Sequence, residues 1–131
     1  MQIRHKNREI YFREQAKCTQ KYVIPYIEQV LCIKPNLRVL EIGCGEGGNL
    51  KPFLDVGCHC VGIDIDVAQL EKAKAFFANH SLNKNLRLIA NDIYKVSPNE
   101  IGNFDLIILR DVIEHLPNQE LFMHQLKCLM H

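Results

Sequence analysis

The sequence predicts an α/β fold in which helices flank a parallel sheet. Short apolar runs typical of buried strands alternate with stretches of helical periodicity between residues 37 and 131. This alternation is typical of β-α-β units, whose right-handed crossovers make neighbouring strands parallel. The fourth run contains Leu106–Leu109, four consecutive apolar residues, which indicates a strand buried on both faces. A chain of 131 residues is long enough for one domain with one core.

The N-terminal part, residues 1–36, is expected to be a helical segment. Apolar side chains between Tyr11 and Cys32 recur at helical spacing. Pro25 interrupts this pattern and predicts a kink or two short helices, because proline removes a helical hydrogen bond.

Residues 37–131 are expected to form the core, with Gly57 ending its first helix. The polar stretch Tyr94–Asn103 is expected to be irregular, with a turn at Ser97-Pro98-Asn99. The other elements are strands at Leu37–Ile42, Cys58–Ile63, Leu86–Ala90 and Phe104–Leu109, and helices at Asn49–Val56, Val67–His80 and Asn118–His131.

Composition and charge argue against several classes of partner. The formal net charge of +1 lacks the basic excess of nucleic-acid binders. The sequence has no apolar run of transmembrane length, and residues 1–14 are too polar for a signal peptide. We therefore expect no nucleic-acid partner, no membrane partner and a cytoplasmic location.

The six cysteines fit reduced thiols in a cytosol better than disulfides or a metal centre. None of them forms a C-x-x-C pair. Cys58-His59-Cys60 resembles a ligand set, but its alternation is that of a strand with side chains on both faces, and zinc sites need a wider spacing. We expect no metal site.

A glycine-rich turn follows the first strand and is the strongest functional signal. Residues 39–49 read Val-Leu-Glu-Ile-Gly-Cys-Gly-Glu-Gly-Gly-Asn, with Glu41 two places before Gly43. Glycine permits positive φ and close approach of a ligand to the backbone, so the turn predicts a loop that receives a nucleotide-like cofactor. Gly43, Gly45 and Gly48 also fit the dinucleotide pattern G-x-G-x-x-G.

Polar residues follow the other strands as well, at the sheet edge where ligands of such folds bind. Asp64 comes after the second strand and can accept both hydroxyls of a ribose, while Asp66 can cap the next helix. Asp92 and the N–H of Ile93 come after the third strand and can read an adenine edge, although Asp92 is also an ordinary turn residue. Residues 110–117 follow the fourth strand and are dense in ionisable groups.

Together these segments resemble the class I S-adenosylmethionine-dependent methyltransferases, of the type that acts on small molecules. Residues 40–47 are similar to the first motif of that family, E/D-x-G-x-G-x-G, and residues 61–64 to its ribose-binding motif. Residues 91–93 resemble its adenine-contacting motif, and residues 104–116 its fourth-strand motif with a D-V-x-E-H segment. The resemblance implies a Rossmann-like parallel sheet with strand order 3-2-1-4.

The resemblance also implies a role for each matching residue. Glu41 would orient the glycine loop or the amino group of the methionine portion, along which Gly43, Cys44 and Gly45 would lie. Asp64 would hold the ribose with Ile65 beside it, and Asp92 and Ile93 would bind adenine. Arg110 and Asp111 would line the methionine end, and the segment around Tyr11 and Phe12 would cover the cofactor. No catalytic residue is assigned; His115 is a candidate base.

The sequence departs from the family after the fourth strand. Strands 5 to 7 of the family's sheet have no counterpart, which predicts either a C-terminally truncated domain or a natural short protein. Strand 4 would then be an open apolar edge, and such edges pair readily. We therefore expect either association of two copies through strand 4 or a loosely held C-terminal helix that partly covers it.

Three functions remain open on the sequence. The first is methyl transfer from S-adenosylmethionine to an unidentified small-molecule acceptor. The second is a non-catalytic module that binds this cofactor, since the acceptor site would be incomplete. The third is an NAD-dependent oxidoreductase, against which Glu41 and the otherwise unused Asp92 argue.

Overall fold

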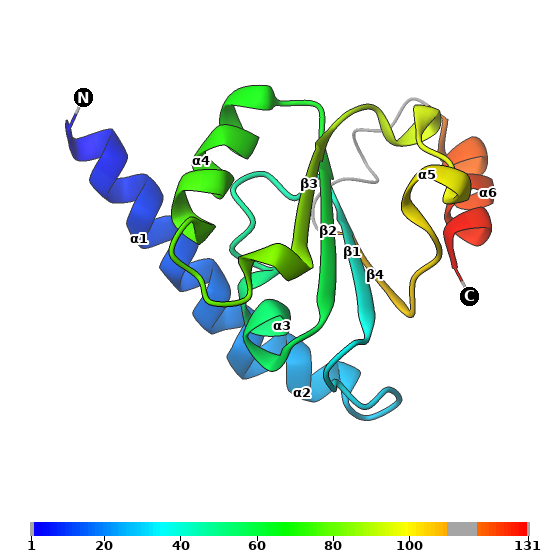
Figure 1. Ribbon diagram of the computed structural model, residues 1–131, viewed down its shortest axis with the longest axis horizontal. Coiled ribbons are helices and arrows are strands. Elements are labelled where there is room, and N and C mark those ends of the chain that lie inside the picture. The colour runs from blue at the N-terminus through cyan, green and yellow to red at the C-terminus, as the bar shows by residue number, and fades with distance from the viewer. Residues whose placement is uncertain (1, 110–117, 131) are drawn as a thin grey trace.

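The computed structural model describes residues 2–109 and 118–130, with side chains from residue 7 onward. Its centre is a four-stranded parallel sheet in the order β3-β2-β1-β4 (Figure 1). The strands are β1 Arg38–Ile42, β2 His59–Asp64, β3 Leu86–Ala90 and β4 Leu106–Leu109. The predicted fold class and strand order are confirmed.

Strand β1 lies between β2 and β4, so its side chains alternate between two covered faces. Leu40 is in register with Val61 of β2 and with Ile107 of β4. β4 begins two residues later than expected because the N–H of Phe104 donates to the carbonyl of Leu129 instead, over 2.8 Å. Phe104 thereby forms an isolated parallel bridge with Met130.

Helices cover both faces of this sheet (Figure 1). α1 to α4 lie on one face and α5 and α6 on the other. The helices are α1 Gln2–Cys18, α2 Ile24–Ile27, α3 Lys51–Val56, α4 Val67–Phe77, α5 Pro98–Ile101 and α6 Gln119–Leu129, the π-helix is η1 Thr19–Val23, and the short 3-10 turns are η2 Asn83–Asn85 and η3 Ile93–Lys95. No helix within the described ranges is long and apolar enough to span a membrane.

The N-terminal segment differs from the expectation in where it is interrupted. The irregularity is not at Pro25 but at the π-helix η1, in which the N–H of Ile24 donates to the carbonyl of Thr19. Pro25 lies in the first turn of α2, where its missing N–H would have no partner in any case. The segment packs into the same core as the sheet through Phe12 and Ile24.

Two apolar cores lie on the two faces of the sheet. Phe53, Phe77 and Val39 belong to the core under α1 to α4. Leu40 and Phe122 belong to the core under α5 and α6. Because β1 alternates, Val39 and Leu40 contribute to opposite cores.

Arg38 fastens the start of β1 to the segment before β4. Its guanidinium donates to the carbonyls of Ile101 and Asn103 over 2.6 and 2.7 Å, and it lies 4.9 Å from the centre of the Phe104 ring. The stretch expected to be irregular contains a short helix, α5, that begins at Pro98. The Arg38 contacts hold the end of this helix and the residues after it.

Candidate functional site

The backbone of the glycine loop between β1 and α3 distinguishes the G-x-G-x-G spacing from the G-x-G-x-x-G spacing. Gly43, Gly45 and Gly47 have φ of 73°, 54° and 86°, whereas Gly48 is not in this left-handed region. Positive φ at alternate positions matches the spacing of the methyltransferase motif and not G-x-G-x-x-G. Gly48 is explained by packing, because a Cβ there would lie 2.9 Å from the carbonyl oxygen of Phe12 in α1.

The side chain of Asp64, at the end of β2, binds the backbone of this loop. Its Oδ2 accepts a hydrogen bond from the N–H of Gly45 over 2.8 Å, and its Oδ1 accepts one from the N–H of Asp66 over 2.9 Å. Asp66 caps α4 by accepting from the N–H of Gln69. The capping role predicted for Asp66 is confirmed. Asp64 lies at the predicted edge, and each carboxylate oxygen retains capacity for a second donor.

The side chain of Cys44, a residue of this loop, packs against Gly62 of β2. A Cβ on Gly62 would lie 2.7 Å from the Cys44 Sγ, so the absence of a side chain at Gly62 makes room for this thiol. Burial, with smaller contributions from the charges of Glu41 and Asp64, raises the pKa of Cys44 far above its usual range. The thiol is therefore protonated at neutral pH and packs as an apolar group.

A cavity of about 450 Å³ lies between α1 and the glycine loop, a size in the range of small-ligand sites. Four residues predicted from the sequence line it together: Glu41, Gly43, Cys44 and Gly45. The lining also contains residues that were not predicted as site residues, among them Arg8, Glu14, Gln15, Glu46, Asn49 and Gln69.

Charge in this cavity is mainly negative. Glu14, Glu41 and Glu46 supply carboxylates, and among the described lining residues only Arg8 supplies a cation. The Arg8 Nε donates to Oε1 of Glu46 over 2.6 Å. The Glu46 side chain is buried, and its Oε2 has no hydrogen-bond partner within the described part of the chain. Such a carboxylate favours a ligand that brings a donor or positive charge.

Glu41 is buried in β1 and is held from the loop side. The Asn49 Nδ2 donates to Glu41 Oε2 over 2.8 Å, and the hydroxyl of Thr19 donates to Asn49 Oδ1 over 2.8 Å. All three residues are almost fully buried. A buried hydrogen-bonded chain therefore connects η1 to the acid of the glycine motif.

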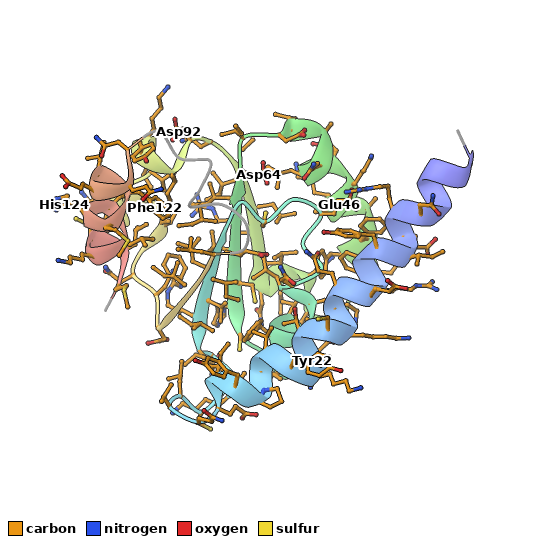
Figure 2. The ribbon with its side chains drawn as sticks, turned by 180° about the vertical axis from the view of Figure 1, so that it is seen from behind. Tyr22, Glu46, Asp64, Asp92, Phe122 and His124 are labelled. Atoms are coloured by element: carbon orange, nitrogen blue, oxygen red, sulfur yellow. The ribbon has the colours of Figure 1, made fainter. Side chains whose placement is uncertain are left out.

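Asp92 follows β3 at the same edge of the sheet as Asp64, and both lie towards the top of Figure 2. The adjacent Asn91 N–H donates to the carbonyl of Asp64 over 3.2 Å, which joins the two strand ends. Asp92 accepts from the N–H of Tyr94 over 2.9 Å and caps η3. The side chain of Ile93 is buried in the core, and Ile65, after β2, is exposed.

Other expectations have mixed outcomes. Tyr11 lines the cavity as expected. Phe12 is not among the described lining residues, and its ring is buried and stacks on Phe76 with centroids 4.6 Å apart. Arg110, Asp111 and His115 lie outside the described residues.

Sequence reasoning missed Arg8, Gln69, Glu46 and Asn49. Glu46 and Asn49 stand in or beside the glycine run, so their polarity at that position was an available signal. Arg8 and Gln69 belong to helices that pack over the loop, and no local pattern indicates this.

Comparison with known proteins agrees with the fold. The sequence model of a methyltransferase domain family matches residues 11–131, and the chain therefore belongs to this family. It is 28% identical over 112 residues to the ubiquinone biosynthesis O-methyltransferase of Bartonella tribocorum, covering 77% of this chain and 44% of that protein. It is also 28% identical over 96 residues to sterol 24-C-methyltransferase ERG6B of Gibberella zeae, covering 72% and 25%. The chain thus spans less than half the length of these relatives.

Solved structures share the same architecture. PKMT2 from Rickettsia typhi, in complex with AdoHcy (S-adenosylhomocysteine), superposes with a TM-score of 0.67 at 28% identity, covering 73% of this chain and 19% of that one. Magnesium protoporphyrin IX methyltransferase from Synechocystis, with bound SAM (S-adenosylmethionine), superposes with a TM-score of 0.69 at 20% identity, covering 88% and 54%. The second likeness concerns the fold alone.

Proposed function

We propose that this chain binds S-adenosylmethionine at the carboxyl ends of β1, β2 and β3 and serves methyl transfer. The observation that carries the proposal is the hydrogen bond from Gly45 to Asp64, which fixes a loop of the methyltransferase spacing against a cavity. Membership of the methyltransferase domain family supports it. So do the S-adenosylhomocysteine and S-adenosylmethionine bound in the two similar structures.

The cavity's charge suits this cofactor better than a dinucleotide. S-adenosylmethionine carries a sulfonium and an ammonium, and the described lining has three carboxylates against one guanidinium. The unpartnered Oε2 of Glu46 is a further acceptor for a positively charged group. The pyrophosphate of NAD would instead face these carboxylates, so the oxidoreductase alternative is disfavoured.

In this proposal the sites divide along the strand ends. Glu41, Gly43, Cys44 and Gly45 hold the methionine portion, with Arg110 and Asp111 at its end. Asp64 and Ile65 hold the ribose, and Asp92 and Ile93 hold the adenine. When bound, the cofactor supplies a methyl group already activated on a sulfonium. The protein's part is chiefly to align acceptor and methyl carbon, which contributes on the order of 7–11 kcal/mol in well-oriented reactions.

We propose a small molecule as the acceptor. By name, one of the two curated relatives above is a methyltransferase of ubiquinone biosynthesis and the other is a methyltransferase of sterols. Both names point to small-molecule acceptors. The net charge of +1 gives no support for a nucleic-acid partner. The six free thiols support a cytoplasmic location. Non-catalytic cofactor binding remains the second candidate, because the chain spans less than half of these relatives.

Association of two copies through β4 remains part of the proposal. β4 pairs with β1 along one side, and within the described residues no strand pairs with its other side. Its four residues are half-buried and apolar. Light scattering at increasing concentration, with hydrogen exchange of the β4 amides, tests this. A monomer with freely exchanging amides at high concentration contradicts it.

Calorimetry with S-adenosylmethionine, S-adenosylhomocysteine and NAD tests the cofactor. We expect both adenosyl compounds to bind and NAD to fail; tight NAD binding without a response to S-adenosylhomocysteine overturns the proposal. Transfer of labelled methyl to a panel of small molecules then separates the two candidate functions. Binding without transfer to any of them favours the non-catalytic module.

A further inference from the structure

We propose that Thr19 is a positioning residue for cofactor binding: acting through Asn49, it holds the Glu41 carboxylate in the orientation that receives the ammonium of S-adenosylmethionine. This inference rests on the proposed function. Glu41 and Asn49 line the cavity, whereas Thr19 does not. Thr19 would therefore influence the cofactor only through the other two side chains.

The direction of each hydrogen bond follows from the chemistry of the groups. An ionised carboxylate only accepts, so the side chain of Asn49 must present its NH₂ to Glu41. The carbonyl oxygen of that amide then points the other way, and it accepts from the Thr19 hydroxyl. The carboxylate thus sets the orientation of the amide, and the Thr19 hydroxyl anchors the amide at its opposite end by donating to Oδ1.

Burial makes the orientation consequential. Thr19, Glu41 and Asn49 are 1%, 1% and 2% exposed, so each hydrogen bond between them lies in a largely desolvated environment. Without the hydroxyl, the buried Asn49 Oδ1 loses this donor, and the amide is no longer anchored from the side of η1. A shift of the amide would move the Glu41 carboxylate with it, which weakens the hold of Glu41 on an ammonium.

Thr19 lies where the N-terminal helical segment departs from regular α-helix. Thr19 begins η1, a π-helix, and it is the buried residue of that helix. Short π-helical turns cost helix stability and are frequent at functional sites. Thr19 and Asn49 are 30 positions apart in sequence, so the contact exists only because α1 and η1 dock beside the glycine loop.

The test compares Thr19→Val with Thr19→Ser in the full chain, using three probes. These are S-adenosylmethionine, S-adenosylhomocysteine and 5′-methylthioadenosine, which lacks the amino acid portion of the cofactor. We expect Thr19→Val to weaken the first two by about tenfold, the size of one weakened hydrogen bond to a charged group. Binding of methylthioadenosine should stay within about twofold, because it makes no contact with Glu41. Thr19→Ser keeps the hydroxyl and should recover most of the affinity.

Thermal unfolding of each variant accompanies the binding measurements. If Thr19→Val does not fold, Asn49→Asp replaces it, since a carboxylate at that position also removes the donor to Glu41 and should give the same selective loss. Equal weakening of all three probes would show a general structural role and overturn the inference. Unchanged affinity for S-adenosylmethionine overturns it too, while the proposed function stands. A wild-type chain that binds none of the probes contradicts the proposed function itself.

Discussion

The carboxylate of Asp64 bridges two strand ends, since it accepts from the backbone N–H of Gly45 over 2.8 Å and from that of Asp66 over 2.9 Å. The glycine loop after β1 is thereby tied to the end of β2. A carboxylate suits this position because both of its oxygens accept hydrogen bonds.

Asp64→Asn should weaken both the loop and the cofactor site. An amide offers only one oxygen, so its NH₂ would oppose one of the two backbone donors. We expect a loss of about 1–3 kcal/mol in the free energy of unfolding, together with weaker binding of S-adenosylmethionine in calorimetry. Asp66→Asn is the matched control, because asparagine caps helices as well as aspartate does. Equal effects of the two substitutions would contradict the bridging role of Asp64.

Gly62→Ala should displace the glycine loop from beneath. The added Cβ would lie 2.7 Å from the Cys44 Sγ and 3.1 Å from the Leu88 Cδ2. Overpacking of this kind costs roughly 1–3 kcal/mol of unfolding free energy, measurable by chemical denaturation. The double variant Gly62→Ala with Cys44→Ala removes the sulfur and should recover part of that loss. A purely additive double variant would show that the thiol and Gly62 are not coupled.

Loss of Arg8 should lower the stability of the fold because it leaves a buried charge on Glu46 without its partner. Arg8→Ala leaves the buried Glu46 carboxylate without its cation, whereas Glu46→Gln removes the charge and keeps an oxygen at Oε1. Because Arg8 is half-exposed, we expect Arg8→Ala to cost only about 1–2 kcal/mol and to expose α1 to proteolysis. The double variant Arg8→Ala with Glu46→Gln should unfold at a higher temperature than Arg8→Ala alone. A lower unfolding temperature of the double variant would show that the ion pair does not hold α1 to the loop.

Alkaline pH should destabilise the fold through buried thiols. Burial raises the pKa of Cys58 from an ordinary value of 9.0 to about 11, and it raises those of Cys44 and Cys60 further. The folded chain then keeps protons that the unfolded chain releases. The stability contribution is therefore complete below pH 9 and is lost as the pH rises towards 11.

Chemical denaturation at pH values from about 8.5 to about 11 measures this loss, because this range spans the unfolded and folded pKa of Cys58. Each unit of raised pKa corresponds to about 1.4 kcal/mol. Cys58→Ala serves as the comparison, because it lacks one of the thiols and should show a shallower decline. Identical slopes in the two proteins would contradict a raised pKa at Cys58.

Much of the architecture was accessible from local sequence patterns. The strand–helix alternation gave the expected element order, and β3, with its apolar residues and flanking polar loop, was predicted with its observed bounds. The order of the sheet came from the resemblance to a family rather than from periodicity. The helix boundaries were less accurate, as at α6, which ends at Leu129, because helix termini depend on capping contacts.

The sequence alone determined that a glycine loop follows a buried strand and that acids follow the neighbouring strands, because these features are local. The tertiary structure decided which glycines take positive φ, that Phe12 belongs to the core, and which distant side chains meet. Arg8 reaches Glu46 across 38 positions, and Thr19 reaches Asn49 across 30. Such contacts arise from the docking of α1 and η1 on the loop, where packing brings together residues that no short-range pattern connects.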